Sequence, residues 1–258
     1  GTAVLPRLPR GNMYAGIGFV LGGGNTQANM SAIRLLLNGK IVWNISGTHL
    51  DTINNYDRLK DTATALSMWF ADPTIQNPIE SQLGAIDTSR GVDEMALEVD
   101  LGAGVAPTLS AFYWALPPSP KGDRFASVFK SMLRTVHAPG AAVSGQNQQV
   151  ALGSKAGGFL RRNHFFHANI TRLAVKRDGV NVLDDQPIAD INYANEARWR
   201  TAQSGHLAFD PLSQQASEDM LPTLRSDGSP AVFEHLVTTS AADTITAYTE
   251  LLASLDRV

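Results

Sequence analysis

The second half of the chain repeats, in order, residue patterns that are found in the first half. In each half a turn dipeptide separates two apolar stretches, and the turn glycines are Gly39 and Gly179. Four further pairs follow in the same order and at nearly the same offset: Leu50–Asn54 with Ile188–Asn192, Asp72-Pro73 with Asp210-Pro211, Leu97–Val99 with Phe233–His235, and Thr108–Phe112 with Thr244–Tyr248. Such a repeat constrains the fold strongly, because each copy must form the same structural unit.

Each copy is predicted to be mainly β. Residues 95–101 alternate between apolar and polar, with a period of two that indicates a half-buried strand. Asn38-Gly39 and Asp178-Gly179 supply the positive φ angles of tight hairpin turns. A first strand is predicted at Met13–Leu21, followed by a glycine-rich loop at Gly22–Asn25. Two antiparallel sandwiches of this size are typical of jelly rolls, each of which has about eight strands in two sheets.

One short helix is predicted in each copy. In the first copy Thr48 is the expected N-cap, and Leu50 and Ile53 follow at helical spacing. In the second copy Pro187 stands where a helix begins. The fold class is therefore all-β, with two tandem jelly-roll sandwiches and short helices in the loops.

The expected domain division places the first jelly roll at 1–120, a connection that is partly loop at 121–154, and the second jelly roll at 155–258. The proline-rich stretch Pro117–Gly122 ends the first copy. Ala138–Ser154 contains few large apolar residues and is predicted to be a loop. Ala126–Val136 fits either a strand or a short helix.

The composition excludes several classes of protein. The 258 residues carry a net charge of −3, so the basic excess of a nucleic-acid-coating protein is missing. Only 17% of the residues are charged, against about 25% in soluble domains. The apolar runs are far shorter than the ~20 residues of a membrane helix. The absence of cysteine excludes disulfides, thiolate metal sites and cysteine nucleophiles. Since the chain starts at Gly1 and not at a methionine, we expect its original N-terminus to lie upstream.

The candidate catalytic and metal-binding motifs are weak. The glycines between Gly16 and Gly24 do not have the spacing of a dinucleotide-binding loop. The six histidines contain no His-x-His pair, and His164 and His167 would point to opposite faces of a strand. The adjacent carboxylates Asp93-Glu94 and Asp184-Asp185 diverge and are interpreted as turn residues. We therefore predict no catalytic, cofactor-binding or metal-binding residues and no cofactor.

The clustered aromatic and basic residues are also predicted to be parts of the fold and not of a binding site. Arg161-Arg162, with Phe165 and Phe166, is predicted to be an ordinary strand edge, because one basic doublet in an acidic chain is poor support for nucleic-acid binding. Trp43, Trp69 and Trp114 lie in apolar segments and are expected in the core, whereas Trp199, in a polar stretch, is the candidate for exposure.

The order of these segments resembles a known family, the major capsid proteins of tailless icosahedral bacteriophages of the corticovirus kind, which are distantly related to the tectivirus coat. The resemblance covers most of the chain and is poorest at Pro117–Ser154. The residues that carry it are Ile33–Trp43 and Leu50–Tyr56 in the first half, and Arg161–Phe166, Ile170–Leu173 and Asp178-Gly179 in the second.

The resemblance implies a structural virion protein without catalytic residues. It implies a homotrimer that packs as a pseudo-hexamer into an icosahedral shell, with neighbouring capsomers and penton or minor capsid proteins as partners. An internal membrane or its proteins is a further candidate partner, and no sequence-specific nucleic acid is expected. The expected location is the virion, after assembly in the host cytoplasm.

Two alternatives stay open from the residues. A two-domain carbohydrate-binding or glycan-hydrolysing sandwich would present an exposed aromatic platform with carboxylates in a groove. A metal-dependent bicupin enzyme would hold tightly bound metal.

Overall fold

The computed structural model describes residues 1–5, 7–74, 80–89, 91–102, 108–116, 131–152, 157–212 and 219–254. The chain divides into two compact units. The first comprises Gly1–Asn54, Leu59–Thr135 and Leu252–Val258, and the second comprises Asn55–Arg58 and Val136–Leu251. The proline-rich segment that the sequence predicts as the end of the first copy lies outside the described residues, as does Ser154.

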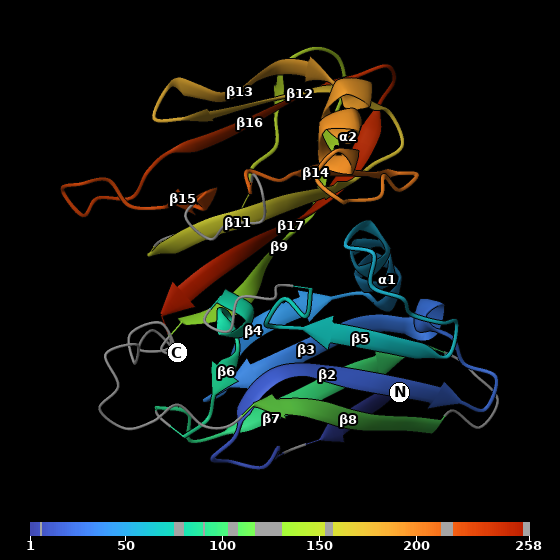
Figure 1. Ribbon diagram of the computed structural model, residues 1–258. Coiled ribbons are helices and arrows are strands. Elements are labelled where there is room, and N and C mark those ends of the chain that lie inside the picture. Colours follow the sequence, from blue (N-terminus) through green and yellow to red (C-terminus); the bar gives the residue numbers. More distant parts are fainter. Residues whose placement is uncertain are drawn as a thin grey trace. The chain divides into compact units, whose positions relative to one another are not determined.

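The first unit contains two β-sheets (Figure 1). One has the strand order β1-β7-β3-β4, formed by β1 (Thr2–Leu5), β7 (Met95–Leu101), β3 (Met30–Leu37) and β4 (Lys40–Ile45). In the other, β2 (Met13–Gly22) is hydrogen-bonded to β5 (Ala65–Trp69), β6 (Ile86–Asp87) and β8 (Thr108–Leu116). The strand predicted at Met13–Leu21 is thus confirmed as β2, and a further strand, β1, precedes it. The alternation in β7 buries Met95, Leu97, Val99 and Leu101, as its period of two requires.

The second unit is built in the same way. One sheet has the order β10-β16-β12-β13, formed by β10 (Gln148–Gln149), β16 (Phe233–Thr239), β12 (Ile170–Arg177) and β13 (Val180–Pro187). The other has the order β14-β11-β17-β9, formed by β14 (His206–Phe209), β11 (Gly158–Phe166), β17 (Asp243–Ser254) and β9 (Ser131–Val143), with β15 (Leu221–Pro222) paired to β11. Leu160, Phe165, Leu173, Val237 and Ile245 belong to the core of this unit.

The two units correspond strand by strand. The strand orders β1-β7-β3-β4 and β10-β16-β12-β13 are equivalent, and β2 and β11 each lie at the interior of the other sheet. The registers agree as well, since Leu35 pairs with Leu97 and Val175 pairs with His235. Even an irregularity is repeated: the pairing shifts after Met30, the first residue of β3, and after Ile170, the first residue of β12. The prediction of a duplicated sandwich is confirmed.

The two predicted hairpin turns are also equivalent. Asn38 and Asp178 have φ angles of 50° and 52°, and the glycines that follow them have φ angles of 76° and 80°. Each turn is hydrogen-bonded to the segment before the neighbouring strand: the amide of Asn38 donates to Glu94 O, and the amide of Asp178 donates to Val232 O.

Among the described residues, α1 (Gly47–Tyr56) lies mostly in the first unit and α2 (Ile188–Glu196) lies in the second, and short 3₁₀ turns lie at Gln27–Asn29 and Glu80–Gln82. Pro187 precedes α2 directly, as predicted. The prediction of Thr48 as the N-cap of α1 is wrong. The amide of His49 donates to the hydroxyl of Ser46, so Ser46 caps the helix and Thr48 lies inside its first turn.

Three other sequence expectations concern loops and turns. Ala138–Val143, predicted as loop, continues strand β9, because a strand paired within a sheet needs few large side chains. Asp184 and Asp185 lie on β13 and not in a turn. Asp185 forms an ion pair with Arg172 on the neighbouring strand, with 2.7 Å between Asp185 Oδ2 and Arg172 Nε. Asp93 and Glu94 do lie in the loop before β7, as predicted.

Candidate functional site

The most concentrated chemistry in the second unit is a network of buried charges around Arg162 on β11. Arg162 is fully buried, and its Nη1 lies 2.8 Å from both carboxylate oxygens of Asp57. Its Nε lies 2.9 Å from Asp210 Oδ2. Arg200 contacts the same two carboxylates, at 2.9 Å from Asp57 and 3.2 Å from Asp210. Two guanidinium groups and two carboxylates therefore neutralise one another inside the unit.

The expectation that Arg161-Arg162 is an ordinary strand edge is wrong for Arg162. Strand β11 lies between β14 and β17 and is not an edge. Burial alone lowers the pKa of Arg162, but Asp210 and Asp57 outweigh that effect and raise it well above its usual range. Burial, reinforced by Asp210, raises the pKa of the neighbouring Tyr56 well above its usual value. The basic doublet is a misleading signal because its acidic partners come from segments that are distant in the chain.

A second polar group adjoins this network. The rings of His164 and His206 stack at a centroid distance of 5.2 Å, and His164 Nδ1 lies 3.0 Å from His206 Nε2. On its other side, His164 Nε2 lies 3.4 Å from Glu250 Oε1. Arg161 Nε lies 3.7 Å from Glu250 Oε2. An arrangement in which His206 Nε2–H donates to His164 Nδ1, and His164 Nε2–H donates to Glu250 Oε1, satisfies this geometry.

Glu250 is ionised in this arrangement. Its burial alone raises its pKa, but the Arg161 guanidinium, His164 and Arg162 outweigh that effect and hold the pKa far below its usual range. The carboxylate is therefore a charged acceptor between the Arg161 guanidinium and the His164 imidazole.

The His164/His167 pair does not converge on a shared site. His164 is buried against His206, whereas His167 follows the end of β11, and its Nδ1 accepts the amide of Ile170 at 3.2 Å. Burial, opposed by Asp243, lowers the pKa of His167 and favours the neutral ring. Within the part of the chain that the structure describes, no group of three or more His, Cys, Asp or Glu side chains is placed to hold a metal ion.

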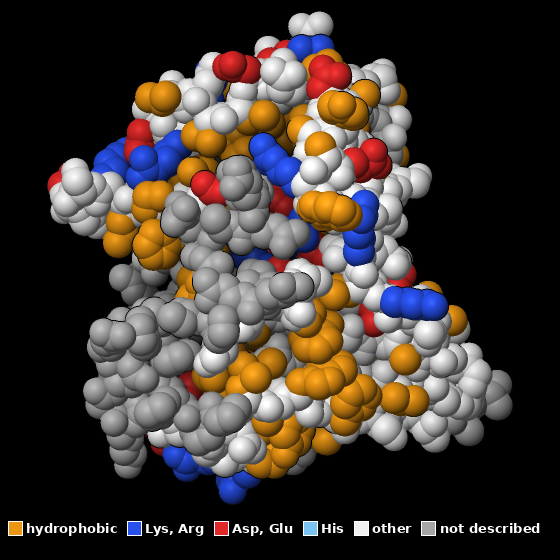
Figure 2. Space-filling model, in the orientation of Figure 1, with side chains coloured by type: hydrophobic (Ala, Val, Ile, Leu, Met, Phe, Trp, Pro, Cys, Tyr) orange, Lys and Arg blue, Asp and Glu red, His pale blue; other side chains and the backbone are white. Residues whose placement is uncertain are grey.

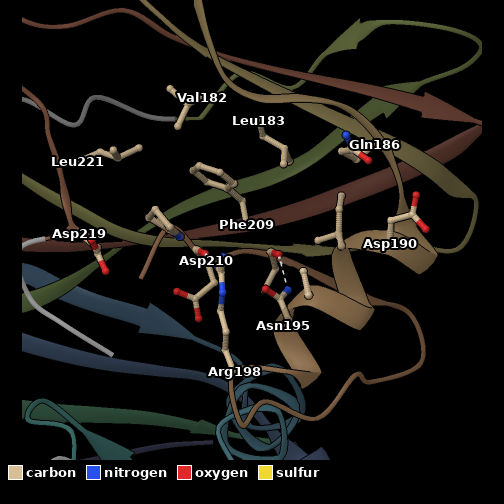
Figure 3. A pocket seen from close by; sticks show the side chains of 14 residues that line it. Val182, Leu183, Gln186, Asp190, Asn195, Arg198, Phe209, Asp210, Asp219 and Leu221 are labelled. Carbon is tan, nitrogen blue, oxygen red and sulfur yellow. Dashed lines mark hydrogen bonds between the residues drawn. The ribbon is translucent and has the colours of Figure 1, made fainter. Parts of the chain in front are cut away.

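A cavity of about 400 Å³ lies beside the charge network in the second unit (Figure 3). Its apolar wall includes Leu183, Phe209 and Leu221, and its polar wall includes Arg198 and Asp210. Arg198 Nη1 donates to the backbone oxygen of Asp210 at 3.3 Å, and the carboxylate of Asp210 is held by Arg162 and Arg200. Its central polar groups are therefore used within the fold, and we assign the cavity no ligand.

The first unit carries an apolar surface of a different kind. Figure 2 shows hydrophobic side chains gathered over β5, β2 and β8. The indoles of Trp69 and Trp114 stack at 4.2 Å, and Phe112, which is 48% exposed, lies edge-on to Trp114 at 4.9 Å. The sequence prediction that all three tryptophans are core residues is therefore wrong for Trp69 and Trp114, which are half-buried, and right for Trp43. Trp199 is 70% exposed, as predicted.

The described helices include none that is long and apolar enough to cross a membrane.

Comparisons with known proteins identify this architecture. Among solved structures, the major capsid protein P2 of bacteriophage PM2 is similar with a TM-score of 0.80 and 16% identity, over 97% of this chain and 92% of that chain. A chain of the Sulfolobus turreted icosahedral virus is similar with a TM-score of 0.70 and 12% identity, over 98% and 86%. A chain of the PBCV-1 virus capsid is similar with a TM-score of 0.58 and 10% identity, over 99% and 91%. A comparison with curated proteins returned no match.

The double jelly roll predicted from the sequence is thereby confirmed as the fold. The alternative of a carbohydrate-binding or glycan-hydrolysing sandwich finds no support in these comparisons. Family matches cover both halves: residues 1–115 match the viral coat protein P2 N-terminal domain, and residues 131–255 match the viral coat protein P2 C-terminal domain. The family matches cover most of the chain, and the fold agrees with them. The chain therefore belongs to the viral coat protein P2 family, and its role is that of a structural, non-enzymatic protein of the virion capsid.

Proposed function

We propose that this capsid protein assembles as homotrimers that act as pseudo-hexameric capsomers of an icosahedral shell. The observation that carries the proposal is the equivalence of the two units in strand order, register and helix position. Three chains with two similar units each supply six similar blocks. Six similar blocks around a threefold axis approximate a hexagonal tile, and tiles of this kind can cover a closed surface.

Cyclic symmetry favours this arrangement energetically. A ring of identical head-to-tail contacts closes without leaving an unsatisfied contact surface within the capsomer. Obligate interfaces of this type bury about 2,000 Å² or more and have apolar centres. The charged fraction of 17% suits a chain that covers much of its flanks with neighbours.

The proposal extends to partners and place. Trimers would contact neighbouring capsomers and penton or minor capsid proteins, and an internal membrane or its proteins is the further surface that one end of a capsomer could meet. We propose assembly in the host cytoplasm, no sequence-specific nucleic-acid contact, and no catalytic, cofactor or metal residue. We also propose the working division into 1–120, 121–154 and 155–258.

Size-exclusion chromatography with light scattering tests the oligomeric state. The expected mass is three times the chain mass of 27.7 kDa, and electron microscopy of the same peak should show hexagonal outlines. A chain that stays monomeric up to its solubility limit overturns the trimer, and a stable dimer or tetramer does so equally.

A further inference from the structure

The sheets that contain β2 and β11 have equivalent outer faces. Asn54 at the end of α1 donates to Ser67 O on β5, and Asn195 near the end of α2 donates to Ala208 O on β14. Ser67 pairs with Gly18, and Ala208 pairs with His164. Gly18 and His164 therefore hold the same position in the two units. By the same register, Ala65 corresponds to His206, and Gly16 corresponds to Arg162.

The outer face in the second unit is polar and covered. It presents Arg162, His164 and His206, which are all buried. The cover is the segment Asn55–Arg58, which belongs to this unit. Asp57 neutralises Arg162, and the ring of Tyr56 lies 5.3 Å from that of His206. A helix end with one carboxylate and one aromatic ring is thus the matching partner of a face with guanidinium and imidazole groups.

The equivalent face in the first unit is apolar and exposed. Glycines replace the arginine and the histidine, and aromatic rings lie against these glycines. A Cβ at Gly16 would meet Trp69 at 2.9 Å, and a Cβ at Gly18 would meet Phe112 at 2.3 Å. Phe112 is 48% exposed and Val20 is 45% exposed. Exposed apolar side chains that gather on one face mark a candidate interaction site on a capsid protein.

The end of α2 corresponds to the segment Asn55–Arg58. Arg58 and Trp199 have left-handed φ angles of 61° and 67°, and their amides donate to the residues three positions earlier, Asn55 and Glu196. Tyr56 and Asp57 are engaged on a sheet face, and Arg58 lies 5.6 Å from the centre of the Trp199 ring. The end of α2 nevertheless displays two aromatic side chains to solvent. Trp199 is 70% exposed and Tyr193 is 76% exposed.

We infer that the end of α2 from a second copy of this chain docks on the outer face of β5, β2 and β8, as Asn55–Arg58 docks on the outer face of β14, β11 and β17. Both surfaces are exposed in a single chain, so each is open to a second copy. The inference rests on the proposed function, because it supplies the head-to-tail contact that a closed trimer needs.

The two contacts differ in chemistry, so each helix end is expected to bind one sheet face and not the other. Asp57 would lose its guanidinium partner on the apolar face, and Trp199 would desolvate charges on the polar face. Each mismatch leaves a buried charge unpaired, which discriminates strongly between sites. On the α2 end, Arg198 corresponds to Asp57, but its guanidinium is held by the backbone oxygen of Asp210, which leaves Trp199 as the contacting group. The pairing of the Asp57 helix end with the guanidinium and imidazole face, and of the Trp199 helix end with the aromatic face, fixes the order of units around the ring.

Crosslinking between chains tests the contact in a background without cysteine. Tyr56 lies against His206, and the equivalent residues are Ala197 on the α2 end and Ala65 on the apolar face. Chains carrying only Ala65→Cys and chains carrying only Ala197→Cys are assembled together and treated with a short bis-maleimide. A covalent dimer is expected in the mixture and in neither single variant. Ile41→Cys, which replaces a 56% exposed side chain on β4, is the matched partner control for Ala197→Cys and should give no dimer.

Light scattering on the same samples distinguishes a failure of the docking inference from a failure of the proposed trimer. Trimers without the Ala65–Ala197 crosslink overturn the docking inference and leave the trimer standing. A dimer formed by Ala65→Cys chains alone overturns it also, since the apolar face would then meet itself. Monomers overturn both.

A second variant measures the energy of the contact. Trp199→Glu should raise the concentration at which trimers dissociate by about tenfold or more, because a charge would enter the apolar contact. Phe159→Glu replaces another aromatic side chain of 49% exposure, on β11, and should leave dissociation unchanged. Equal effects of the two variants overturn the inference.

Discussion

Asn54 and Asn195 make the same hydrogen bond in the two units. The side-chain amide of Asn54 donates to Ser67 O at 2.6 Å, and that of Asn195 donates to Ala208 O at 3.1 Å. In both units the bond ties the last turn of the helix to the middle of a strand in the sheet that the helix adjoins. Both asparagines are buried, at 3% and 4% exposure, so no water replaces the bond.

Removing either amide should therefore destabilise its unit. Asn54→Ala and Asn195→Ala should each cost about 1–3 kcal/mol, because a buried strand carbonyl loses its donor. Thermal unfolding of each variant is the measurement. Asn192→Ala, one turn earlier on α2 and only half-buried, is the control and should change stability by less than about 0.5 kcal/mol. Equal losses in the control and in Asn195→Ala would contradict the assignment.

This pair also shows what the sequence pattern could determine. The repeat correctly predicted the fold class and the equivalent turns, because Asn-Gly and Asp-Gly prescribe one local geometry. It aligned Asn54 with Asn192 and Leu97 with Phe233, whereas the hydrogen bonds equate Asn54 with Asn195 and Leu97 with His235. Each error is about one period of its helix or strand, so the buried face is right and the register is not.

The buried charge network around Arg162 could not be predicted from the sequence, for a different reason. Nothing local distinguishes Arg162 from an exposed arginine, since its partners come from segments that only the topology brings together. Likewise, Trp69 and Trp114 were predicted as core residues from their apolar neighbours. They instead cover Gly16 from the outer face, where the missing side chain leaves room for the two rings.

The Arg162–Asp57 pair should be strongly coupled. Arg162→Gln leaves two buried carboxylates with a single guanidinium, and Asp57→Asn leaves excess positive charge, so each should cost about 3–5 kcal/mol. The double variant should cost clearly less than the two single losses together, since it removes both charges. Urea unfolding of the four proteins measures this coupling. Arg172→Gln, which breaks an exposed pair with Asp185, is the control and should cost less than about 1 kcal/mol. Additive losses would show that the pair is not coupled.

The two glycines of β2 should differ in tolerance. A Cβ at Gly16 would lie 2.8 Å from the backbone oxygen of Met68, which cannot move without disturbing the sheet. The three atoms nearest to a Cβ at Gly18 all belong to the ring of Phe112, an exposed side chain that can swing away. Gly16→Ala should therefore lower the thermal midpoint more than Gly18→Ala. Adding Phe112→Ala should rescue the packing clash at Gly18, with less effect on Gly16→Ala. Equal midpoints for the two single variants would contradict this account.

The charge on Glu250 should make capsid-protein stability fall in acid. The folded pKa of Glu250 lies far below its unfolded value of about 4.3, so the unfolded chain takes up a proton first as the pH falls. The stabilisation is therefore complete above about pH 5 and is lost progressively below that pH.

Glu250→Gln should be less stable than the parent at pH 7, and the gap in stability between the two proteins should narrow below about pH 4. Thermal unfolding at a series of pH values follows the gap. Glu98→Gln, whose carboxylate on β7 of the first unit is partly exposed beside Arg34, should show a much smaller gap at pH 7. A gap at Glu250 that is constant from pH 7 to pH 3 would mean that its stabilising effect does not depend on the ionised carboxylate.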